Sequence, residues 1–246
     1  GAFGTAIVPG NATGHIARDP ESGAIWGTTE QPLGTKKIVH LWRWTSALGL
    51  RKVATLDSAD GEGPVKAITV GPGGAIYGVC AGGGTAGKGT LWAWIDSTGF
   101  NNLADFGAPP PITTPPGAGL AVTPLGTVYG VTETGGADNA GRIWRWVPVV
   151  GLTVVKDFVT ATTGAMDGTD TGMIVATDGA LYGCASSGGG HGGGTLWECS
   201  PGGTPARRSR RSARSAPQTR CRPSRAPSPP QPAPPPDTAS STTESA

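Results

Sequence analysis

Aromatic side chains recur along this chain at four fixed positions of a unit about fifty residues long. The sequence has eight Trp, three Tyr and four Phe residues, and all of them except Phe100 occupy one of these positions. The first position holds Trp26, Tyr77, Tyr129 and Tyr182, at steps of 51, 52 and 53 residues. The second holds Trp42, Trp92, Trp144 and Trp197, the third Trp44, Trp94 and Trp146, and the fourth Leu56, Phe106 and Phe158, with Phe3 in a partial leading copy. Self-similarity at a fixed period indicates a tandem repeat, so the fold must be built from stacked copies of one unit.

The spacing inside the unit predicts four short antiparallel strands. The first aromatic position is followed by the second after 15 or 16 residues, which is typical of a hairpin with a loop of fixed length. Residues 75–81 and 90–96 are rich in β-formers, and Gly, Pro, Asp and Thr separate such segments. No stretch sustains the apolar period of a helix. In the second unit we expect strands near residues 66–70, around Tyr77, at residues 92–94, and one ending at Phe106.

A four-stranded unit of this length has the size of a kelch-type propeller blade. We therefore predict an all-β fold, a β-propeller of about four blades over residues 1–203, with units at residues 4–56, 57–106, 107–158 and 159–203. Two arrangements are compatible with the sequence. In one, residues near Phe3 complete the last blade and close a ring of four blades. In the other, the chain is a fragment of a larger propeller, since propellers have about four to eight blades.

The tryptophans of the second and third positions are predicted to form the core. Side chains alternate along a strand, so Trp92 and Trp94 lie on one face, and the intervening Ala93 lies on the other. Arg43 and Arg145 occupy the place of Ala93 in their own units. A large ring in nearly every copy is what packing between neighbouring sheets requires, and we favour this role over a platform for a ligand.

The repeat units resemble a known bacterial family. Residues 129–144 (YGVTETGGADNAGRIW) and 182–197 (YGCASSGGGHGGGTLW) are similar to the GloVer repeat, which has Leu-Tyr-Gly-Thr-Thr, a Gly-Gly loop and then Gly-Thr-Val-Phe. The connecting segments at residues 60–78 and 167–183 are similar as well, and the likeness covers roughly residues 3–203. This chain departs from the family in using Trp for Phe and in having QPLGTKKIVH (residues 31–40) where the first unit should have a Gly-Gly loop. The resemblance implies a secreted or cell-surface bacterial propeller and implies little about activity.

Residues 204–246 differ sharply in composition from the repeats. They contain eight Arg, ten Pro, two acidic residues and no aromatic residue, which gives this segment a net charge of +6. Such a segment buries too little apolar surface to offset the entropy of ordering, and we expect it to be disordered. Two origins are compatible with this composition: a functional basic tail that attracts anionic partners, or an end produced by a shift of reading frame.

Motifs for metal, nucleotide or covalent chemistry are weak in this sequence. The four cysteines include no Cys-x-x-Cys pair, and the hairpin predicted around Tyr182 places Cys184 and Cys199 too far apart for a disulfide. Residues 81–90 (AGGGTAGKGT) contain Gly-Lys, but Gly89 follows Lys88 where a phosphate-binding loop needs Ser or Thr. We therefore expect no cofactor and no metal, and we assign no catalytic residue.

Two functional classes are compatible with the sequence. The first is a non-catalytic, secreted or cell-surface module that binds or scaffolds a protein or carbohydrate partner through loops on a rigid β framework. The alternative is a propeller-type hydrolase or lyase with its site at one mouth of the propeller. Nucleic acid is not expected beyond non-specific contact with the Arg-rich tail, and the sequence has no transmembrane segment. The candidate ligand-binding residues are His15, Arg43, Arg145 and His191.

A single geometric question separates the two classes. These four residues and Asp19 are polar and break the repeat. If they converge at one mouth of the fold, a small-ligand site or an enzyme is favoured. Fold alone does not decide between the classes, because one fold supports many functions.

Overall fold

The architecture is described by a computed structural model, which covers residues 10–34, 36–56, 61–107, 112–166, 172–200 and 220–223. Within these residues the chain forms sixteen strands, and its single helical element is the short 3-10 turn η1 (Pro72–Gly74). The strands are β1 (Asn11–Arg18), β2 (Ile25–Leu33), β3 (Lys36–Thr45), β4 (Gly49–Leu56), β5 (Glu62–Val70), β6 (Ile76–Gly82), β7 (Thr90–Ile95), β8 (Gly99–Asp105), β9 (Pro116–Val122), β10 (Val128–Thr132), β11 (Arg142–Val147), β12 (Gly151–Asp157), β13 (Met173–Val175), β14 (Leu181–Ala185), β15 (Thr195–Ser200) and β16 (Arg220–Pro223).

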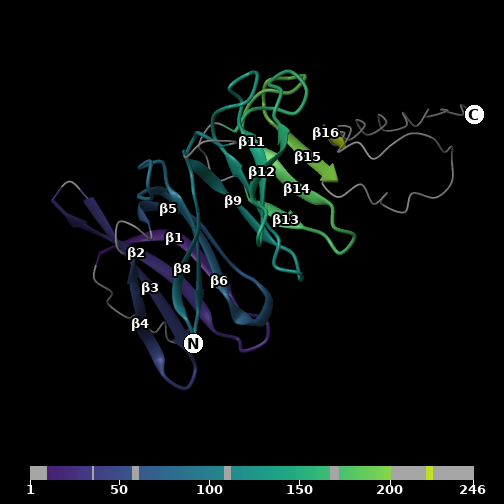
Figure 1. Cartoon of the computed structure of the whole chain (residues 1–246). Coiled ribbons are helices and arrows are strands. Elements are labelled where there is room, and N and C mark those ends of the chain that lie inside the picture. Colours follow the sequence, from purple (N-terminus) through teal and green to yellow (C-terminus); the bar gives the residue numbers. More distant parts are fainter. Residues whose placement is uncertain are drawn as a thin grey trace, which may run out of the picture.

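The strands form four antiparallel sheets of four strands, each made of consecutive strands in chain order. We call them blade 1 (β1–β4), blade 2 (β5–β8), blade 3 (β9–β12) and blade 4 (β13–β16). Figure 1 shows the blades following one another in the order of the sequence. The predicted all-β, propeller-like fold with four-stranded units is therefore confirmed.

The blades pack face to face in succession. The first strands of neighbouring blades touch, β1 with β5, β5 with β9 and β9 with β13. One hydrophobic cluster lies between blades 1 and 2, a second between blades 2 and 3, and a third between blades 3 and 4. Among the described residues no core cluster joins blade 4 to blade 1, so the four blades form an open arc.

Each interface between blades buries side chains from the second and fourth positions of the repeat. Trp92, Trp144 and Trp197 are almost completely buried, which confirms their predicted role in packing. Phe106 of blade 2 meets Trp144 of blade 3 edge-on at 5.3 Å between ring centroids, and Phe158 of blade 3 meets Trp197 of blade 4 at 5.4 Å. We call the face of a blade that carries this tryptophan its front face, and the opposite face, which packs on the next blade, its back face.

The last strand of blade 4 comes from the C-terminal segment of the chain. The place beside β15, which the closed four-blade ring assigned to residues near Phe3, is taken by β16, with Cys199 opposite Cys221 in the register. Phe3 itself lies outside the described residues. Residues 204–246, for which we predict disorder, also lie outside them, except for the strand β16.

Residues 31–40, which replace the Gly-Gly loop in the first unit, extend a hairpin. Strands β2 and β3 remain paired as far as Leu33 and Lys36, so a long hairpin with a tight turn replaces the Gly-rich loop of the other blades. Figure 1 shows this hairpin projecting from the body of the molecule. The Gly-rich loops after β6, β10 and β14 lie at the same end of the arc, while the short turns after β1, β3, β5 and β7 lie at the opposite end.

Candidate functional site

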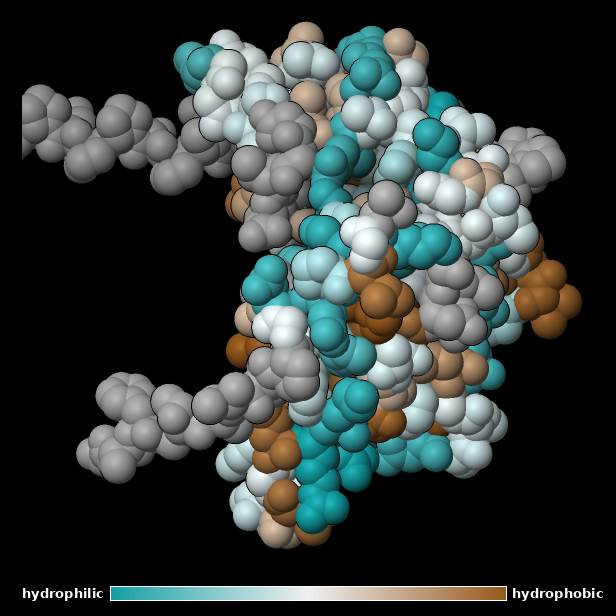
Figure 2. Space-filling model, turned by 90° about the vertical axis from the view of Figure 1, so that its left-hand side faces the viewer, coloured by the Kyte–Doolittle hydropathy of each residue, from teal (hydrophilic) through white to brown (hydrophobic). Residues whose placement is uncertain are grey.

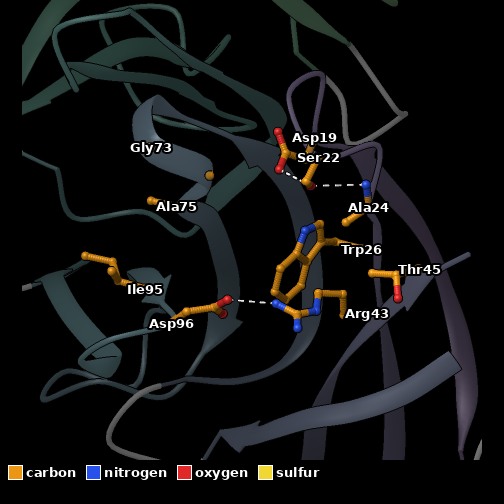
Figure 3. A pocket seen from close by; sticks show the side chains of 11 residues that line it. Asp19, Ser22, Ala24, Trp26, Arg43, Thr45, Gly73, Ala75, Ile95 and Asp96 are labelled. Carbon is orange, nitrogen blue, oxygen red and sulfur yellow. Dashed lines mark hydrogen bonds and ion pairs between the residues drawn. The ribbon is translucent and has the colours of Figure 1, made fainter. Parts of the chain in front are cut away.

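A pocket of about 290 Å³ opens between blades 1 and 2 at the end that carries the short turns. Its walls come from the turn after β1, strands β2 and β3, the turn containing η1, and the turn after β7. Figure 3 shows the side chains that line it. These are Asp19, Ser22, Ala24, Trp26, Arg43, Thr45, Gly73, Gly74, Ala75, Ile95 and Asp96.

Asp19 forms one side of the pocket and holds the turn after β1. Its Oδ1 accepts the backbone N–H of Glu21 at 3.0 Å, and its Oδ2 accepts the hydroxyl of Ser22. The Ser22 hydroxyl, and then the Glu21 N–H, lower the pKa of the Asp19 carboxyl below its usual value. Asp19 is therefore an ionised, turn-forming carboxylate, a common role for Asp at such positions.

Arg43 forms the centre of the pocket. It lies opposite Trp26 in the pairing of β2 with β3, and its guanidinium carbon is 5.3 Å from the centroid of the Trp26 ring. This distance is within the range of a cation–π contact. Arg43 Nη1 also donates to Asp96 Oδ2 at 2.7 Å, so one guanidinium joins the two blades. Figure 3 shows Arg43 between Trp26 and Asp96.

Asp96 is fixed from its own blade as well as from blade 1. The indole N–H of Trp94 donates to Asp96 Oδ1 at 3.0 Å, while Arg43 holds Oδ2. The side chain of Asp96 is 64% exposed and that of Arg43 is 31% exposed. An ion pair this accessible contributes little to stability, typically below about 1 kcal/mol. Its groups are, however, within reach of a ligand.

The two carboxylates of the pocket, Asp19 and Asp96, are absent from the corresponding places of the other blades, whereas Arg43 recurs as Arg145 in blade 3. The place of Asp19 is held by Gly71, Thr123 and Ala176, which open the equivalent turns. The place of Arg43 between blades 2 and 3 is held by Ala93, and the place of Asp96 is held by Pro148 in blade 3. The pocket thus joins two carboxylates that each occur in one blade only with an arginine that occurs in two blades.

The residues predicted as site candidates do not all converge. Arg43 and Asp19 line the pocket together. Arg145 lies opposite Tyr129 on the back face of blade 3, two blades away, and its buried Nε has no hydrogen-bond partner among the described residues. His191 is exposed in the Gly-rich loop at the opposite end, and His15 lies on β1, away from the pocket lining.

Asp96 is the pocket residue that the sequence analysis missed. It sits in a turn two residues after Trp94, where an acidic residue is unremarkable. The sequence does distinguish Asp96 from the repeat, because Ser46 and Pro148 occupy the equivalent place in blades 1 and 3. A comparison of all polar residues across the repeat register would have selected it.

The chemistry of the pocket suits a polar ligand. Arg43 brings N–H donors, Asp19 and Asp96 bring carboxylate acceptors, and Ala24, Ala75 and Ile95 supply apolar wall. Among the described residues no group of three or more His, Cys, Asp or Glu side chains is placed to hold a metal ion. In the same part of the chain no helix is long and apolar enough to cross a membrane.

Comparison with known proteins gives a matching family and distant structural likenesses. No curated protein matches the chain significantly. Among solved structures, the gluconolactonase XC5397 from Xanthomonas campestris is similar with a TM-score of 0.44 and 10% identity, over 75% of this chain and 71% of that chain. The model of the Gloeobacter/Verrucomicrobia repeat matches residues 11–210, and the chain belongs to that family.

Proposed function

We propose that this protein is a non-catalytic binding module whose pocket between blades 1 and 2 takes a hydroxyl-rich carbohydrate ligand. One observation carries the proposal: Asp19 and Asp96 each occur at their repeat position in one blade only, and together with Arg43 they line the same pocket. The glycines and tryptophans of the repeat, in contrast, pack in the same way in blades 2, 3 and 4. Two carboxylates that each occur in one blade only, and that line one pocket with the same arginine, favour a function specific to this pocket.

The bonding of the two carboxylates favours binding over catalysis. A general acid needs a carboxyl that holds its proton near neutral pH, which calls for a raised pKa. Asp19 has a lowered pKa, and both of its oxygens already accept hydrogen bonds from its own turn. Asp96 likewise has one oxygen bound by Trp94 and the other by Arg43. The same groups are well suited to sugar hydroxyls, which both donate and accept hydrogen bonds.

A secreted or cell-surface location is part of this proposal. Cys199 forms a disulfide, and disulfides persist mainly in oxidising compartments. The location is tested by fractionating the source cells and detecting the protein with an antibody. Recovery from the cytoplasm alone would contradict it.

Binding is tested by titrating the full chain with a panel of soluble neutral and acidic oligosaccharides in a calorimeter. We expect at least one sugar to bind with a stoichiometry of one per chain. Arg43→Ala should abolish the heat signal, because the guanidinium joins the pocket walls and supplies its N–H donors. The matched control is Arg145→Ala, which removes the equivalent arginine two blades away and should bind like the original protein.

Two results would contradict the proposal. Binding that survives Arg43→Ala, or that is lost equally in Arg145→Ala, would place the ligand elsewhere. Cleavage of the bound sugar during the titration, detected by chromatography of the mixture, would show an enzyme of the hydrolase or lyase class.

A further inference from the structure

The front face of blade 1 has the residues of a blade interface, but among the described residues no blade packs against it. On the front faces of blades 2, 3 and 4, the position opposite the conserved strand glycine holds Ile68, Leu120 and Met173, which are 9%, 7% and 6% exposed. The same position in blade 1 holds Ile16, which is 76% exposed. Ile25 and Trp44 on this face are 38% and 40% exposed. Figure 2 looks onto this side of the molecule and shows brown, hydrophobic residues among teal ones.

The back face of blade 4 is uncovered in the same way. Leu41, Leu91 and Ile143 hold one position on the back faces of blades 1, 2 and 3, where each is at most 1% exposed. The equivalent Leu196 of blade 4 is 52% exposed. Cys184 is exposed where Val79 and Val131 are buried, and Ile174 is 64% exposed where Ala121 of blade 3 is 5% exposed.

The three internal interfaces indicate what covers these faces. Each internal interface places the front face of one blade on the back face of the blade before it. The arc therefore ends in one uncovered front face and one uncovered back face, which are the two halves of a contact that the chain makes three times. Repeat proteins that remain single normally end in units with a polar outer face, and neither of these faces is polar throughout.

We propose that a second copy of this chain covers the faces in a head-to-tail contact, with the front face of blade 1 from one copy on the back face of blade 4 from the other. Such a contact is heterologous, so two copies that make it reciprocally close a ring. Ile16 and Leu196 then take the buried places that Ile68 and Leu91 hold inside the chain. The contact is independent of any ligand in the pocket between blades 1 and 2.

Light scattering coupled to size-exclusion chromatography of the full chain tests this proposal. We expect a mass of two copies for the unmodified protein and of one copy for either Ile16→Asp or Leu196→Asp. Leu125→Asp is the control, because Leu125 is 92% exposed in the turn after β9, outside both faces. Circular dichroism of the sheets should be the same for all the variants, since each changes an exposed side chain.

Mixing the two single-copy variants distinguishes head-to-tail contact from any other association. The Ile16→Asp protein keeps an intact blade 4 face and the Leu196→Asp protein keeps an intact blade 1 face, so an equal mixture should regain the mass of two copies. A single-copy mass for the unmodified protein at its highest soluble concentration would overturn the proposal. So would a mixture that stays at the mass of one copy, or a Leu125→Asp control that dissociates as the two variants do.

Discussion

The indole ring of Trp144 lies across Gly130 on the neighbouring strand: a Cβ atom built on Gly130 would be 2.0 Å from Cζ2 of that ring. Blade 2 has the same relationship between Gly78 and Trp92, also at 2.0 Å, and blade 4 has it between Gly183 and Trp197, at 2.3 Å. In blades 2, 3 and 4 the ring of the tryptophan at the second position thus packs directly on the glycine after the first aromatic position. Glycine within a strand often marks such a close approach.

Replacing this glycine should destabilise the protein in every blade except the first. Gly130→Ala pushes a methyl group into a ring that is fully buried between blades, and we expect a loss of about 3 kcal/mol in the free energy of unfolding. Urea unfolding followed by tryptophan fluorescence measures it. Gly27→Ala is the control, because a Cβ there meets nothing nearer than 3.6 Å. Equal losses in the two variants would contradict this packing.

Truncating the ring itself should cost a similar amount or more. Trp144 is completely buried, whereas Trp44 at the third position of blade 1 is 40% exposed. We expect Trp144→Ala to lower the free energy of unfolding by about 3–5 kcal/mol. Trp44→Ala should cost less than half as much in the same urea experiment. If Trp144→Ala were the milder change, the core would not lie between the blades.

The two cysteines that are unpaired among the described residues should differ in reactivity. Cys80 is fully buried, and burial raises the pKa of its thiol to about 12, whereas Cys184 is exposed and Cys199 is in a disulfide. Since the thiolate is the reactive form, Ellman's reagent should label one thiol in the native protein at mildly alkaline pH. Cys184→Ser should remove this fast reaction, and Cys80 should react only after unfolding in urea. Two fast thiols in the native protein would show that blades 1 and 2 separate readily.

Stability should fall in mild acid because of His40. This residue is 7% exposed, and burial, with a smaller contribution from the charge of Lys52, lowers its pKa below the usual value. Its ring nitrogens lie 2.9 Å from Thr55 Oγ1 and 3.2 Å from Gln31 Oε1. The unfolded chain takes up a proton on this residue near pH 6.5, and the folded chain does so only at lower pH. The contribution is therefore complete above about pH 6.5 and is lost as the pH falls through the folded pKa.

The variant His40→Asn tests this assignment. We expect its free energy of unfolding to change less than that of the original protein between about pH 7 and pH 5.5, the window in which an unperturbed histidine titrates and most carboxylates do not. Urea midpoints measured at several pH values in this window give the slopes. Identical slopes for the two proteins would mean that another group is responsible.

Sequence reasoning succeeded where one physical cause acts in every copy of the unit. The tryptophans of the second position, the glycines beneath them and the hairpin spacing recur because each interface between blades has the same geometry, and the repeat displays that geometry directly. Phe100 lies outside the pattern, yet it packs edge-on against both Trp92 and Trp94 at 5.2 and 5.4 Å. A contact made in one blade alone leaves no periodic signal.

The candidate site was only partly predictable for the same reason. Arg43 and Asp19 could be selected as polar residues that blade 2 lacks at the same positions, but their meeting with Asp96 depends on how blade 2 is turned against blade 1. Strand β16 was not expected, because residues 220–223 lack β-formers. Its place beside β15 follows from backbone pairing with Cys199 opposite Cys221, which composition does not reveal.

If the pocket between blades 1 and 2 is the ligand site, a bound sugar should change the indole N–H signal of Trp94 and leave that of Trp146 unchanged. Trp94 donates its indole N–H to Asp96 in the pocket at 3.0 Å, while Trp146, at the same repeat position, donates to the backbone oxygen of Leu103 at 3.1 Å. Each is assigned in a two-dimensional NMR spectrum through its Trp→Phe variant, and the protein is titrated with the sugar that binds in calorimetry. We expect the Trp94 signal to shift until the sugar saturates the protein while the Trp146 signal stays in place. A bound sugar that leaves the Trp94 signal unmoved, or moves both signals equally, would place the ligand outside this pocket.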